Sequence, residues 1–152
     1  MEVVGVYLAG ETLTPHNHPQ CQRCIGTPGT HQPTYGGGPD AFLAKFSTAS
    51  GSRFWGTYYG GSGPERAHGC AVDGNGAVYL ADSTATSHNS PNCNGCIATP
   101  GTHQPSYGGI YDAFLAKFLQ VSQGSVYGGL ITVVVIWIMV LTAQWMPMEQ
   151  CI

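Results

Sequence analysis

The sequence predicts an all-β fold built from tandem repeats, and three observations lead to this prediction. Charged residues make up only 9% of the 152 residues, well below the usual share of about 25%. Glycine contributes 22 residues, and short runs rich in Tyr, Thr and Val alternate with Gly-rich segments, as is typical of short strands joined by tight turns. Several segments also recur 72 positions further along the chain.

The repeat contains no insertion or deletion between Val6 and Phe46. Its first copy holds the segments Val6–Ala9, Cys21-x-x-Cys24-Ile25, Thr27–Pro33 and Asp40–Phe46, each of which reappears 72 residues later. Repeats of this kind bury an apolar face against their neighbours, so that a single unit is only marginally stable.

Each period is expected to contain four short strands. In the complete period they fall at 41–46, 54–59, 70–72 and 77–81. The segment Asp73–Gly76 is a strong hairpin turn between the last two, because Gly and Asn tolerate positive φ. Four short antiparallel strands joined by turns are typical of one blade of a β-propeller.

The chain therefore divides into four parts. We expect a partial repeat at 1–39, a complete repeat at 40–111 (blade 40–82, connection 83–111), the start of the next repeat at 112–118 and an apolar tail at 119–152. This amounts to about one complete blade plus partial blades, whereas a closed propeller typically needs four to eight. The open edges predict a fragment that is unstable alone or associates with copies of itself.

Over residues 3–118 the chain resembles the SBBP repeat family, the bacterial β-propeller repeats found in large secreted or surface proteins. The resemblance is carried by the segments Asp40–Phe46, Trp55–Gly61, Ala71–Leu80 and Ala98–Gln104. It implies a propeller fold, a secreted or cell-surface location, and a structural or binding role without catalytic residues or a cofactor. The implied partners are neighbouring blades of a longer chain and a glycan or protein ligand.

The distribution of charge and histidine argues against two other functions. The net charge is −3, and the basic residues are scattered, so nucleic-acid binding has no support. His31 and His103 both follow Pro-Gly-Thr, yet no partner acid and nucleophile recur beside them. Because general-base catalysis needs such partners, we predict that the protein is not an enzyme.

Paired cysteines in the long connections leave two interpretations open. Cys21 and Cys24, and then Cys93 and Cys96, have zinc-knuckle spacing, with His16 and His88 upstream. Metal binding by these six residues is one interpretation. A local disulfide within each pair is the commoner use in secreted proteins, and it is the one favoured here. Cys70 lies on a predicted strand and is expected to be a small core residue.

Two further groups of residues, one acidic and one aromatic, have both a structural and a functional interpretation. Asp40 and Asp112 open strands after Gly-rich turns and are expected to cap those turns through side-chain to backbone hydrogen bonds. A calcium role together with Asp73 and Asn75 is the alternative, although the spacing lacks the later carboxylate of a calcium loop. The aromatic residues Trp55, Tyr58 and Tyr59 could stack on glycans but more often fill the space between sheets.

The tail carries no charged residue between Leu119 and Met148. A membrane segment at about 128–147 would make the protein membrane-anchored with a small β ectodomain, but the apolar run is shorter than the ~20 residues of a typical span. It also lacks a basic cluster on its C-terminal side. A single buried strand would have to be unusually long. If the tail forms a helix, we do not expect that helix to reflect selection for a membrane anchor.

A shifted reading frame explains the tail best. Joining the last base of each codon to the first two bases of the next converts 127–152 into a sequence that aligns without a gap to 55–79. Trp145 followed by Met146 then forces an Asp at the place of Asp73, and Met148 followed by Glu149 forces a Gly at the place of Gly76. We therefore expect the tail to be the next part of the repeat translated out of frame, which the coding DNA would show.

Overall fold

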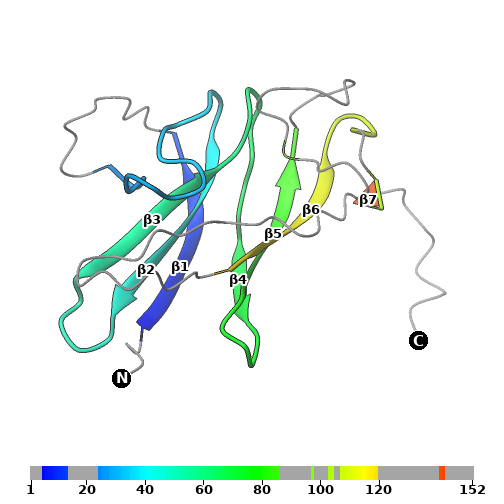
Figure 1. Cartoon of the computed structure of the whole chain (residues 1–152). Coiled ribbons are helices and arrows are strands. Elements are labelled where there is room, and N and C mark those ends of the chain that lie inside the picture. Colours follow the sequence, from blue (N-terminus) through cyan, green and yellow to red (C-terminus); the bar gives the residue numbers. More distant parts are fainter. Residues whose placement is uncertain are drawn as a thin grey trace.

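The computed structural model describes residues 5–13, 24–85, 97, 103–104, 107–119 and 141–142. These residues contain seven strands in two antiparallel sheets and no helix, which confirms the all-β prediction (Figure 1). The first sheet has the order β1-β2-β3, with β1 at Gly5–Thr12, β2 at Asp40–Ser47 and β3 at Arg53–Tyr59. The second has the order β4-β5-β6-β7, with β4 at Gly69–Val72, β5 at Val78–Thr84, β6 at Asp112–Phe118 and β7 at Leu141–Thr142.

The two sheets pair equivalent strands in the same register. In the first sheet Val6 lies opposite Phe46 and Leu8 lies opposite Ala44. In the second sheet Val78 lies opposite Phe118 and Leu80 lies opposite Ala116, which are the same pairs moved by 72 positions. The repetition in the sequence is therefore also a repetition of strand pairing.

The four strands expected to form one blade at 40–82 are divided between the two sheets. β2 and β3 belong to the first sheet, whereas β4 and β5 belong to the second. The connection after β3 crosses between them: Glu65 N donates to the Pro39 carbonyl before β2, and Arg66 N donates to the Ser83 carbonyl in β5. The second sheet therefore begins at β4, while the expected domain boundaries stay a prediction. A periodic sequence fixes the length of a unit but not the strand at which its sheet begins.

A hydrophobic core formed by described residues lies between the sheets. Tyr59 of β3 packs into it with its ring centroid 5.2 Å from that of Phe114 and 5.7 Å from that of Phe118. Because successive side chains of a strand point to opposite faces, each sheet contributes alternate residues. These are Ala41, Leu43, Trp55 and Tyr59 from the first sheet and Val78, Leu80, Phe114, Ala116 and Phe118 from the second.

The loop before β2 lies along the free edge of β3. Thr27 N donates to the Gly56 carbonyl at 2.8 Å, and Tyr58 N donates to the Gln32 carbonyl at 2.9 Å. A Cβ on residue 56 would lie only 2.3 Å from the Ile25 carbonyl oxygen, so this close approach requires glycine. The loop thus satisfies backbone groups that an exposed edge strand would leave unpaired.

The expected membrane segment at about 128–147 lies outside the described residues, apart from Leu141 and Thr142. These two residues pair with Ala113 and Asp112 at the edge of β6. Within the described part of the chain, no helix is long and apolar enough to cross a membrane. The out-of-frame interpretation of the tail stays a prediction.

Candidate functional site

Most of the proposed cysteine and histidine ligands lie outside the described residues, namely Cys21, Cys93, Cys96, His16 and His88. Cys24 is described: it is 5% exposed and disulfide-bonded. Its pairing with Cys21 stays a prediction. Cys70 carries a free thiol that packs against the core, where burial raises its pKa. No three metal-binding side chains come together among the residues that can be placed.

His31 contacts aromatic residues from both sheets. Its ring stacks on Tyr59 with centroids 5.8 Å apart and meets the edge of Phe118 at 6.3 Å. Partial desolvation against these rings lowers the pKa of His31, which stays exposed on its other side, and so favours the neutral imidazole. The contacts assign this histidine a packing role between the sheets.

The most unusual polar site is a pair of buried carboxyl groups, Asp40 at the start of β2 and Glu65 in the crossing connection. Neither residue has measurable solvent exposure. Asp40 Oδ2 accepts hydrogen bonds from Gly36 N at 2.6 Å and from Gln32 Nε2 at 3.1 Å. Glu65 Oε2 accepts one from Gly61 N at 2.7 Å, while its Oε1 accepts one from the Thr84 hydroxyl at 2.8 Å.

The two carboxyl groups lie on either side of Gly60. A Cβ on residue 60 would lie 2.5 Å from Asp40 Oδ1 and 2.6 Å from Glu65 Oε2, so the two oxygens are neighbours and the position requires glycine. Asp40 Oδ1 itself has no hydrogen-bond partner among the described residues. Burial raises the pKa of Asp40 from 3.8 to about 6, and the nearby charge of Glu65 makes a smaller contribution in the same direction. Asp40 can therefore hold a proton at mildly acidic pH, and the hydrogen bond from Thr84 to Glu65 connects this site to the end of β5.

The second copy repeats the arrangement around Asp112. Asp112 Oδ2 accepts a hydrogen bond from Gly108 N at 2.6 Å and lies 3.5 Å from Gln104 Nε2. These residues are the equivalents of Gly36 and Gln32, and Asp112 Oδ1 again lacks a hydrogen-bond partner within the described part of the chain. The predicted turn-capping roles of Asp40 and Asp112 are therefore confirmed.

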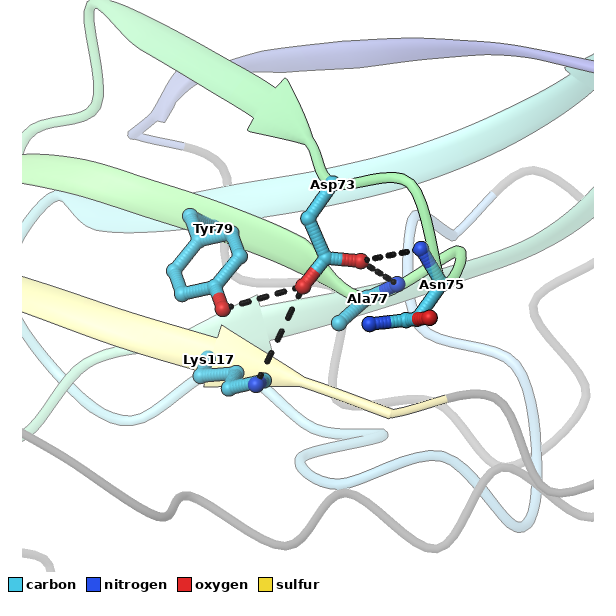
Figure 2. Close-up of polar contacts among 5 residues, drawn as sticks. All are labelled: Asp73, Asn75, Ala77, Tyr79 and Lys117. Atoms are coloured by element: carbon cyan, nitrogen blue, oxygen red, sulfur yellow. Dashed lines mark hydrogen bonds and ion pairs between the residues drawn. The ribbon is translucent and has the colours of Figure 1, made fainter.

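Asp73, the other residue considered for calcium, is engaged by its own hairpin (Figure 2). Its Oδ1 accepts hydrogen bonds from Asn75 N at 2.9 Å and Ala77 N at 3.0 Å, and its Oδ2 accepts one from the Tyr79 hydroxyl at 3.1 Å. Lys117 Nζ lies 3.9 Å from Oδ2. The backbone hydrogen bonds, that from Ala77 above all, lower the pKa of Asp73, and the geometry is that of a turn.

Sequence reasoning missed a repeated contact between lysine and tyrosine on paired strands. Lys117 Nζ lies over the ring of Tyr79, 5.2 Å from its centroid. In the first sheet Lys45 Nζ lies 5.3 Å from the ring centroid of Tyr7 in the same way. The signal was present, because both residues recur at the offset of 72, but only the strand register shows that they face each other.

The candidate glycan-stacking residues lie inside the protein. Trp55, Tyr58 and Tyr59 are 8%, 0% and 2% exposed. Tyr59 donates its hydroxyl hydrogen to the Ile97 carbonyl at 3.1 Å, while the ring of Trp55 packs against Tyr7 at 6.0 Å. Trp55 and Tyr59 thus fill the space between the sheets, whereas Tyr58 is buried on the other face of the first sheet against the ring of Tyr35.

Two sheet faces remain as candidate interaction surfaces. On the first sheet, Val6 and Leu8 are 54% and 51% exposed, whereas their equivalents Val78 and Leu80 in the second sheet are fully buried. We define the open face of the first sheet by Val6, Leu8, Phe42, Phe46 and the neighbouring Ile25. The outer face of the second sheet is formed by Tyr79, Ala81, Ala113, Leu115 and Lys117.

Comparison with protein-family models and with curated proteins found no match for this chain.

Proposed function

We propose that this chain is a non-catalytic SBBP-type repeat module that acts by packing against neighbouring repeats of a β-propeller. One observation carries the proposal. Val78 and Leu80, which the second sheet buries against the first, have the same type and register as Val6 and Leu8, which the first sheet leaves more than half exposed. A unit whose two faces both suit packing against another unit is what a repeat array requires.

The use of polar and aromatic groups supports a structural role. The buried acids Asp40 and Glu65 accept hydrogen bonds from backbone N–H groups, and Asp73 is occupied by its hairpin. His31 and Tyr59 contact residues of the other sheet. These groups hold loops and sheets together.

The setting we propose is a secreted or cell-surface bacterial protein, in which the module supports a binding surface for a glycan or a protein. The disulfide at Cys24 favours an oxidising compartment. The resemblance of residues 3–118 to repeats of secreted proteins is the second support for this location.

Tandem arrays of the 72-residue unit test the propeller. One to eight copies of residues 40–111 would be produced, and their thermal stability and small-angle scattering would be measured. A propeller closes at one number of units within the range of about four to eight. We expect melting temperature to rise sharply at that number and the scattering to fit a disc. Steady lengthening with each added copy, without closure, would contradict the propeller and indicate a linear stack.

A further inference from the structure

The interface between the two sheets provides a template for what covers the open face of the first sheet. In that interface Val78 and Leu80 are buried beneath the side of the first sheet that carries Ala41 and Leu43. The open face presents the equivalents of the covered residues, Val6 and Leu8. Whatever covers it should therefore carry equivalents of the covering residues.

The outer face of the second sheet carries such equivalents. Ala113 and Leu115 correspond to Ala41 and Leu43 in sequence and in register. Their surroundings differ, because Ala41 and Leu43 are fully buried whereas Ala113 is exposed and Leu115 is only partly buried. One molecule thus displays the covered half of this interface and the part of the covering half that comes from the strand of Ala41 and Leu43, while Trp55 and Tyr59 of β3 have no equivalents among the described residues of the second sheet.

We propose that a second copy of this chain docks head to tail, with the outer face of its second sheet covering the open face of the first sheet. This inference rests on the packing of repeats in the proposed function and extends it from units of one chain to separate chains. The contact is heterologous, since the two joined faces differ, and each docked copy keeps one face of each kind. Copies therefore add in one direction and form either a ring or an open stack.

The lysine on the outer face is compatible with this contact. Lys117 lies on that face beside Tyr79. Its equivalent, Lys45, lies on the side of the first sheet that packs on the second, and extends over the ring of Tyr7. The same lysine–tyrosine arrangement therefore already occurs at the template interface, where the long aliphatic stem of the lysine can pack while its ammonium group stays solvated.

Two charge-introducing variants separate the two faces. Leu8→Arg blocks the open face and Ala81→Arg blocks the outer face, both at residues exposed enough to leave the fold intact. Ala49→Arg, in the exposed turn after β2, adds the same charge away from both faces. Sedimentation equilibrium should show concentration-dependent association of the wild-type chain, weakened at least about tenfold in either face variant and unchanged in the control.

A mixture of the two face variants gives the decisive result. Leu8→Arg retains a working outer face and Ala81→Arg retains a working open face, so equal amounts should form a one-to-one dimer and nothing larger. Weakened association of Leu8→Arg together with unchanged association of Ala81→Arg would indicate a symmetric contact and overturn the proposal. Equal weakening by Ala49→Arg, or a wild-type chain that stays monomeric, would also overturn it.

Folding and the wider proposal are checked separately. Amide hydrogen exchange establishes that each variant retains its core, and Val6→Arg, at a residue 54% exposed, replaces Leu8→Arg if the latter unfolds. If the separate chains fail to associate while the tandem arrays still close, head-to-tail docking is wrong and the proposed function stands. If the chains associate but the arrays never close, the propeller is wrong and the docking stands.

Discussion

The strand pair β1–β2 of the first sheet and the strand pair β5–β6 of the second sheet carry the same repeated segments. They differ mainly in whether another sheet packs on their faces. β1 and β2 pair in the register that β5 and β6 repeat, yet Leu8 is 51% exposed whereas Leu80 is fully buried. Strand pairing here follows from the local sequence, while burial follows from whether another sheet lies on that face. The repeat therefore encodes two packing faces, and in each sheet only one of them is covered by the other sheet.

The strands beside the repeated pairs, β3 in the first sheet and β7 in the second, differ as well. Opposite Ala41 lies Tyr59, part of a seven-residue strand that supplies aromatic rings to the core. Opposite the equivalent Ala113 lies Leu141, in a strand of two residues, whereas the repeat would place residue 131 there. The loss of the motif after Phe118 thus coincides with a shortened third strand.

The largest expected effect comes from truncating the same residue in each sheet. Leu80→Ala should lower the free energy of unfolding by about 2–5 kcal/mol, because it leaves a cavity in the core. Leu8→Ala should cost less than about 1 kcal/mol, since the side chain is half exposed. Urea denaturation at low protein concentration, where copies stay apart, measures both.

The same two variants can also contradict the difference in burial between the two sheets. Equal costs for Leu8→Ala and Leu80→Ala would mean that the open face is covered even in the dilute chain. Repeating the measurement at high concentration sharpens the test, because head-to-tail docking should then raise the cost of Leu8→Ala while leaving that of Leu80→Ala nearly unchanged.

A smaller effect should appear as a pH dependence at Asp40. The folded pKa of about 6 exceeds the ordinary value of 3.8, so the folded chain binds this proton more tightly than the unfolded chain. The contribution of Asp40 to stability is therefore full below about pH 4 and is lost as the pH rises through 6. Asp40→Asn should stabilise the chain more at pH 7.5 than at pH 4.5, by on the order of 1–2 kcal/mol.

Because Asp40→Asn and wild type share every other titrating group, the difference between their stabilities at each pH cancels the contributions of those groups. His31 acts in the opposite sense, because its lowered pKa means that stability is lost when it is protonated, but both proteins share it. Glu65→Gln removes the neighbouring charge and should reduce the pH dependence at Asp40. If the difference in unfolding free energy between Asp40→Asn and wild type stayed constant between pH 4.5 and pH 7.5, the raised pKa of the buried acid would be contradicted.

The smallest expected effect concerns the hairpin of the second sheet. The pKa of Asp73 is lowered below 3.8, first by its hydrogen bond from Ala77 N, so its contribution to stability is present above about pH 4 and is lost as the pH falls through the folded pKa. Asp73→Ala should slightly destabilise the chain at pH 7 and flatten its acid response. Asn75→Ala is the matched control, since Asn75 donates through its backbone N–H; an equal loss there would contradict the role of the carboxylate.

The strands were predictable, but their grouping was not. Alternating side chains and Gly-rich turns located the strands from β2 to β5 to within a few residues, and the Asp73–Gly76 turn is present with Gly76 at φ 81°. Their division between two sheets depends on where the chain crosses over, and a cyclic pattern does not specify that. The open face likewise escaped prediction because Val6 and Val78 both begin the same four-residue segment, Val-Tyr-Leu-Ala.

The acid pair was only half predictable. Asp40 belongs to the repeated motif and was expected to cap a turn. Glu65 lies 25 positions away, and the position 72 residues after it is Trp137, in the tail, so no repeated signal connects the two acids. Their meeting is a consequence of the crossing connection, which only the three-dimensional structure shows.

The loop along β3 determines the direction in which such an assembly can grow. With Gly56 and Tyr58 bonded to residues 27–32, the β3 edge of the first sheet has few backbone groups left to pair with a foreign strand, so at this edge the sheet resists widening into the continuous ribbon of an amyloid fibril. Copies that accumulate are instead directed to add perpendicular to the sheets, where side-chain shape rather than backbone pairing selects the partner.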